Sequence, residues 1–134
     1  MVVPGWLKYY DGIHPVWGQC PHEVKEQETF FNQLRIRHPR LHAIAIHPRN
    51  EGKRTKVQMD RQKAEGGFVK GASDIIIPGS PCFVCELKRR DRTKSKWESG
   101  QLDYLLACHD MGAFVCVAFG WEQAIAGVEE WSAK

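Results

Sequence analysis

The stretch KGASDIIIPGSPCFVCELK, residues 70–88, constrains the fold more than any other part of the chain. Two strand-forming runs, DIII and FVCELK, flank the turn sequence PGSP, which predicts a β-hairpin. Because side chains alternate between the two faces of a strand, Glu86 and Lys88 share one face and lie about 6 to 7 Å apart. Asp74 begins the partner strand. The hairpin is therefore expected to bring Asp74 toward Glu86, with Lys88 beside them.

Two carboxylates that converge in this way repel each other unless a cation lies between them or one takes up a proton. A hard divalent cation such as Mg²⁺ or Mn²⁺ resolves the conflict, because carboxylate oxygens are its preferred ligands. Such an ion lowers the pKa of a bound water, which a neighbouring lysine can orient or deprotonate. Since lysine is a poor base at neutral pH, we assign Lys88 first to positioning and charge stabilisation. Taken alone, an E-x-K strand end is more often a surface salt bridge.

The rest of the pattern predicts a single α/β domain over residues 1–134, with an irregular arm over 1–22 and the core over 23–134. Periodicity and end signals predict helices over 23–37, 55–65, 98–111 and 121–131, and strands over 42–47, 74–77, 83–88 and 113–119. The last strand is fully apolar and is expected at the centre of the sheet. The arm carries aromatic residues that could stack on bases but more often cap a core or an oligomer contact: Trp6, Tyr9, Tyr10 and Trp17.

Basic residues are unevenly distributed, although the net charge is only +3. Residues 88–96, KRRDRTKSK, carry six basic side chains against Asp91, and residues 49–70 carry seven against three acids. Such clusters attract polyanions, of which nucleic acid is the commonest, and the alternative is a solvated basic face. The candidates for nucleic-acid contact are Arg54, Lys70, Arg89, Arg90, Lys94 and Lys96.

Membrane insertion and secretion find no support in the sequence. The longest nearly apolar stretch, 112–121, has about ten residues, too few to span a bilayer. The first residues lack the basic and apolar regions of a signal peptide. Five cysteines form no regular framework, which indicates free thiols in a reducing compartment. We therefore expect a cytoplasmic protein.

The pattern KGASDIII-x(8)-ELK, followed by Gln101 in SGQLDYL, resembles the PD-(D/E)xK nuclease superfamily. Within it, the chain is most similar to the virus-type replication-repair nuclease (VRR-NUC) domain, especially its small stand-alone phage versions. The similarity extends from about Glu28 to the C-terminus and includes HPRNEGKR, AEGG-x-x-KG and GWEQAI. Ser73 departs from the superfamily pattern, which has Pro there. That position shapes a turn and binds no metal.

This resemblance implies a restriction-endonuclease-like core, with a central mixed β-sheet flanked by helices. It implies Asp74 and Glu86 as metal ligands, with the Leu87 carbonyl as a candidate third ligand. It further implies Lys88 as the catalytic lysine, Glu28 as an acid supplied by the first helix, and Gln101 as the glutamine of the following helix. The expected activity is that of a Mg²⁺- or Mn²⁺-dependent endodeoxyribonuclease that leaves 5′-phosphate and 3′-hydroxyl ends. Stand-alone phage members act as homodimers on branched DNA such as four-way junctions, and two-fold symmetry suits a substrate that needs two cuts.

Two alternatives remain open at the level of sequence. One is a non-catalytic DNA-binding module, against which the set of Asp74, Glu86 and Lys88 argues, because binding alone does not need converging acids. The other is a sequence-specific, restriction-type nuclease of the same superfamily. That enzyme would carry an added recognition region, for which 134 residues leave little room.

Overall fold

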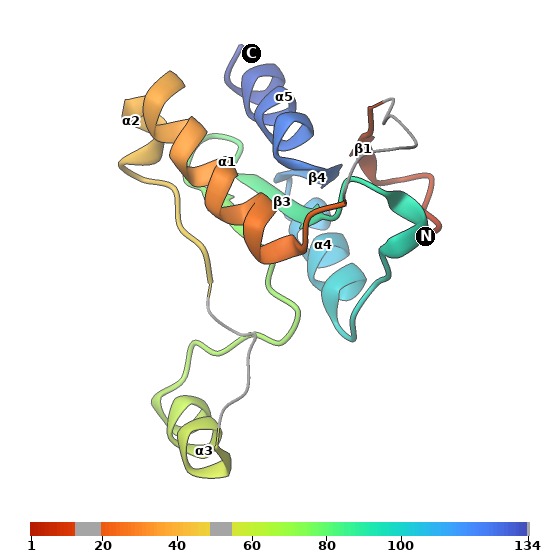
Figure 1. Ribbon diagram of the computed structural model, residues 1–134. Coiled ribbons are helices and arrows are strands. Elements are labelled where there is room, and N and C mark those ends of the chain that lie inside the picture. Colours follow the sequence, from red (N-terminus) through yellow and green to blue (C-terminus); the bar gives the residue numbers. More distant parts are fainter. Residues whose placement is uncertain (13–19, 49–54, 134) are drawn as a thin grey trace.

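A mixed β-sheet with helices on both faces forms the body of the protein in the computed structural model, which describes residues 1–12, 20–48 and 55–133 (Figure 1). The elements are β1 (Lys8–Tyr10), α1 (Glu23–Arg37), α2 (Pro39–His42), α3 (Lys56–Glu65), β2 (Ile75–Ile77), β3 (Phe83–Lys88), a short 3₁₀ helix η1 (Arg92–Lys94), α4 (Gln101–Asp110), β4 (Phe114–Phe119) and α5 (Trp121–Ser132). The strand order is β1-β4-β3-β2, in which β1 and β3 run parallel to β4 and β2 runs antiparallel to β3. The predicted α/β class with a mixed central sheet is confirmed.

The predicted hairpin is formed by β2 and β3, in the register Ile75–Cys85, Ile76–Val84 and Ile77–Phe83. Alternation along each strand divides their side chains between two apolar clusters. One cluster contains Ile75, Ile77, Phe83, Cys85 and Leu87 and is covered by residues of α1 and α5. The other contains Ile76 and Val84 and is covered by α4 and the N-terminal residues. The Glu86 and Lys88 side chains follow Val84 and therefore lie on the α4 face of the sheet.

The strand β4 lies between β1 and β3, which confirms its predicted central position. Its partner β1 falls inside residues 1–22, which the sequence analysis described as an irregular arm. That prediction was wrong for Lys8–Tyr10, because a three-residue strand is too short to give a periodic signal. Of the aromatic residues of the arm, Tyr10 packs against the α5 side of the core and its hydroxyl donates to Glu130. Trp17 lies outside the described residues.

The predicted strand over 42–47 is largely wrong. Pro39 begins the short helix α2, which continues through His42, and only Ile46 forms a β-bridge, with Ile76 of the edge strand β2. The alternating pattern HAIAIH predicts a strand, but its neighbour β2 has only three residues with which it could pair. Without such pairing, alternation of apolar residues alone does not form a strand.

The helix α3 stands apart from the sheet and the other helices (Figure 1). It begins with a capping box, in which the Thr55 hydroxyl accepts from Gln58 N and the Gln58 side chain accepts from Thr55 N. Its C-cap is Gly66, so its bounds agree with the helix predicted over 55–65. None of its residues is buried. Within the described parts of the chain, no helix combines the length and apolar character needed to cross a membrane.

Candidate active site

The hairpin register brings Asp74 and Glu86 to facing positions. The pairs Ile76–Val84 and Ile75–Cys85, continued by one residue, place Asp74 opposite Glu86 on the α4 face of the sheet. Main-chain contact secures this arrangement, because Leu87 N donates to Asp74 Oδ2 at 2.9 Å. Both acids are nearly inaccessible, with exposed fractions of 5% for Asp74 and 1% for Glu86. The two carboxylates thus come from adjacent extended segments and occupy one face.

Gln101 joins the second acid to the lysine. As the first residue of α4, it points at the sheet from the α4 side, and its Nε2 donates to Glu86 Oε1 at 3.0 Å. Its Oε1 accepts from Lys88 Nζ at 2.9 Å and from Glu98 N at 2.8 Å. Gln101 is 3% exposed and Lys88 is 1% exposed. The amide therefore fixes the relative positions of Glu86 and Lys88, while the backbone of the preceding turn fixes the amide.

The Lys88 ammonium is surrounded by acceptors. Besides Gln101 Oε1, Nζ donates to the Lys96 carbonyl at 2.7 Å and lies 3.7 Å from Glu23 Oε1. The ring of Trp97 lies beneath it, with Nζ 5.7 Å from the ring centroid. These contacts hold the Lys88 side chain in one place beside the two acids.

The acid that α1 brings to this site is Glu23 and not Glu28. Glu28 is two residues from both Glu26 and Phe30, which are buried, so helix geometry turns its side chain about 160 to 200° away from the packed face. It is 62% exposed and pairs with Lys25 at 3.9 Å. Glu23, in the first turn, reaches Lys88 instead. Burial raises the pKa of the Glu23 carboxyl, an effect that Lys88 opposes and the Asp74 carboxylate reinforces.

Arg89 and Arg90, which the sequence analysis predicted to contact nucleic acid, instead make hydrogen bonds within the protein. The Arg89 guanidinium donates to the carbonyls of Cys20 at 2.7 Å and Pro21 at 3.0 Å. Arg90 makes two bonds of 2.9 Å to the carboxylate of Glu26, which is 1% exposed, and also contacts Glu122. Both side chains are thus committed to holding α1 and the segment before it against the end of β3.

The other candidates for nucleic-acid contact have different positions. Lys70, Lys94 and Lys96 are exposed, and Lys96 Nζ lies 3.8 Å from Glu98 Oε1. Arg54 lies outside the described residues. Of the candidates within the described residues, the exposed ones are therefore lysines, on the approach to Asp74 and on the loop after β3.

Four groups of the site were not identified as functional from the sequence. Glu23 could have been found from the helix period, because it precedes Glu26 and Phe30 on nearly the same side of α1. Trp97 and the Lys96 carbonyl carry no sequence signal, because a loop places them. His47 lies beside the first acid, with Nδ1 2.7 Å from the Asp74 carbonyl oxygen; facing a carbonyl, that nitrogen carries the proton and donates.

The donor set fits a hard divalent cation. Across residues 1–12, 20–48 and 55–133, no group of three or more His, Cys, Asp and Glu side chains is placed to hold a metal. An ion at this site would therefore depend on the Asp74 and Glu86 carboxylates, a main-chain oxygen such as the Leu87 carbonyl, and water or phosphate oxygens. Oxygen-only coordination with one or two carboxylates is typical of Mg²⁺.

A close main-chain contact at Gly71 sets the position of α4 relative to Asp74. Gly71 has φ +79°, and a Cβ there would lie 2.2 Å from the carbonyl carbon of Gly100, directly before Gln101. We expect Gly71→Ala to lower the free energy of unfolding by about 2–4 kcal/mol, measured by chemical denaturation, because both the backbone and the contact must change.

The matched control for this variant is Gly112→Ala. Gly112 has φ +92° with open space around it, so its substitution isolates the backbone cost, about 1 kcal/mol. Equal losses in the two variants would show that the approach of Gly71 to Gly100 is unimportant.

Comparisons with known proteins show the fold. No family model matches the chain, and no curated protein matches it. Among solved structures, it is similar to a VRR_NUC domain protein, with a TM-score of 0.66 and 17% sequence identity; the match covers 86% of this chain and 91% of the other. At this identity a structural likeness establishes architecture and leaves activity to be argued from the site. The chain has the fold of a VRR-NUC domain, in agreement with its sequence resemblance.

Proposed function

We propose that this protein is a metal-dependent endodeoxyribonuclease that hydrolyses phosphodiester bonds in branched DNA. The observation that carries the proposal is the buried row of Asp74, Glu86, Gln101 and Lys88, in which facing acids are joined through an amide to a cation. Burying two carboxylates and an ammonium is costly unless the groups are paired or used. The VRR-NUC fold of the chain is consistent with this activity.

In the proposed mechanism, Asp74 and Glu86 would hold Mg²⁺ or Mn²⁺, with the Leu87 carbonyl as a third protein ligand. A bound ion would supply charge neutralisation at the phosphate and a more acidic water. Lys88 stabilises the charge that develops on the phosphate oxygens as water attacks. Gln101 holds Glu86 and Lys88 in register, and His47 holds the main chain at Asp74.

DNA would approach over the exposed lysines of the site. Lys70, Lys94 and Lys96 are exposed, whereas Arg90 is engaged by the buried Glu26 carboxylate, and exposed lysines bind phosphates without reading sequence. We propose that the active form is a homodimer, because two symmetric sites can make the two cuts that a four-way junction requires.

A cleavage panel tests this function. Labelled four-way junction, fork, flap and linear duplex are incubated with Mg²⁺, Mn²⁺ or EDTA. We expect cutting of the branched substrates with either metal, at least about tenfold faster than that of linear duplex, and none with EDTA. Binding without cleavage under every metal condition would identify a DNA-binding module. Cutting of linear duplex at one sequence motif, regardless of branching, would identify a restriction-type nuclease.

A further inference from the structure

A cavity of about 370 Å³ lies directly beside the first acid of the site. Its lining includes His47, Gln62, Phe68, Ala72, Ile76 and Tyr104. Ala72 and Ile76 are each two residues from Asp74, and His47, which also lines the cavity, bonds through Nδ1 to the Asp74 carbonyl. Ile76 packs on the α4 face of the sheet, the face on which Asp74 meets Glu86. The cavity and the acids are therefore neighbours on one surface.

The chemistry of the lining suits a flat heteroaromatic ring. Phe68 and Tyr104 provide aromatic surfaces, and the Gln62 amide and the His47 ring provide hydrogen-bonding groups. Burial raises the pKa of Tyr104 to about 12, with Cys108 adding to the effect, so the phenol stays neutral. The volume falls within the range of about 300–1,000 Å³ that is usual for small-molecule sites.

We propose that this cavity binds one unpaired nucleobase of the DNA substrate, next to the phosphodiester that is cut. The inference rests on the proposed function and deepens it. Bases bind proteins by stacking on aromatic side chains and by hydrogen bonds to their exposed edges, and a base inside a duplex offers neither surface. A site that accepts a base beside the acids therefore favours DNA with unpaired nucleotides at the cut, as at a fork or an opened junction.

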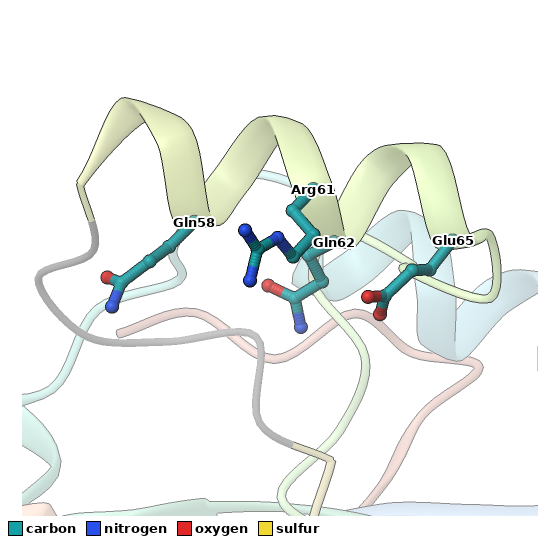
Figure 2. A pocket seen from close by; sticks show the side chains of 4 residues that line it. All are labelled: Gln58, Arg61, Gln62 and Glu65. Carbon is teal, nitrogen blue, oxygen red and sulfur yellow. The ribbon is translucent and has the colours of Figure 1, made fainter.

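The half-buried residue Gln62 is the contribution of α3 to the lining of this site. Gln62 also lines a second pocket, of about 440 Å³ and wide open to solvent, together with Gln58, Arg61 and Glu65 of the same helix. Figure 2 shows these four side chains pointing from the same side of α3. Gln62 is the residue that the two linings share, and Arg61 is the cation among these four side chains.

An abasic scan tests the proposal by binding alone. A labelled fork is prepared with an abasic nucleotide at each unpaired position in turn, and the dissociation constant of the full-length protein is measured in EDTA. We expect about a tenfold loss of affinity at one or two adjacent positions, because stacking of one base is lost. Phe68→Ala should bind the intact fork about tenfold more weakly, and the abasic change should then add nothing.

Two further variants complete the experiment. Gln62→Ala, at an exposed helix, is expected to fold normally and to change which base is preferred at the sensitive position. Val57→Ala, on α3 but outside both cavities, is expected to reproduce the wild-type scan. Equal affinity for all abasic forks would overturn the proposal, and so would a full tenfold abasic loss that persists in Phe68→Ala. The scan measures binding in EDTA and requires no cleavage. It therefore tests base binding even if the protein proves to have no nuclease activity.

Discussion

Glu86→Gln is expected to lower the rate of metal-dependent cleavage about a thousandfold or more, while the protein stays folded and binds DNA. The amide has the size of the carboxylate and keeps an oxygen for the bond from Gln101 Nε2, so packing is preserved. It removes the negative charge that a divalent cation requires, and loss of several kcal/mol of charge stabilisation corresponds to about three decades in rate. The measurements are single-turnover cleavage of a four-way junction with Mg²⁺, binding of the same DNA in EDTA, and the melting temperature.

Glu28→Gln is the matched control for this variant. Glu28 is exposed and faces away from the site, so its substitution should leave cleavage within about twofold of wild type. Wild-type cleavage by Glu86→Gln would remove the basis for the proposed mechanism. A loss in Glu28→Gln as large as that in Glu86→Gln would restore the role that the sequence resemblance assigned to the exposed acid.

The hairpin at the site was predictable because two local signals agree. The turn sequence PGSP fixes where the chain reverses, and alternation then determines which side chains share a face with Glu86. The Gln101 contact followed from the resemblance and not from periodicity. Glu28, which the resemblance implied as the acid of α1, lies opposite the buried residues Glu26 and Phe30, and Glu23 approaches Lys88 instead.

Long-range pairing accounts for the other differences. The strand β1 exists because Lys8–Tyr10 pairs with β4, more than 100 residues away, and nothing local indicates this. The roles of Arg89 and Arg90 depend in the same way on partners that only the fold brings close. A run of basic residues shows that positive charge is present, but whether that charge faces DNA or an internal carboxylate is decided by tertiary structure.

Arg90→Met is expected to destabilise the protein by about 3–5 kcal/mol, because it leaves the buried Glu26 carboxylate without its bidentate partner. Folded domains are typically stable by only about 5–15 kcal/mol, so chemical denaturation will detect this loss readily. The double variant Glu26→Gln with Arg90→Met should recover a large part of it, because a neutral amide is less costly to bury than an unpaired charge.

Lys94→Met is the comparison that separates a structural cation from one that binds DNA. Lys94 is exposed, so its loss should change stability by less than about 0.5 kcal/mol while weakening DNA binding and reducing the salt dependence of that binding by about one counterion. If Arg90→Met instead kept full stability and weakened DNA binding as Lys94→Met does, the guanidinium would belong to the DNA surface. The two cations differ in their expected effect on stability because of burial. Arg90 pairs with the buried carboxylate of Glu26, whereas Lys94 is exposed to solvent.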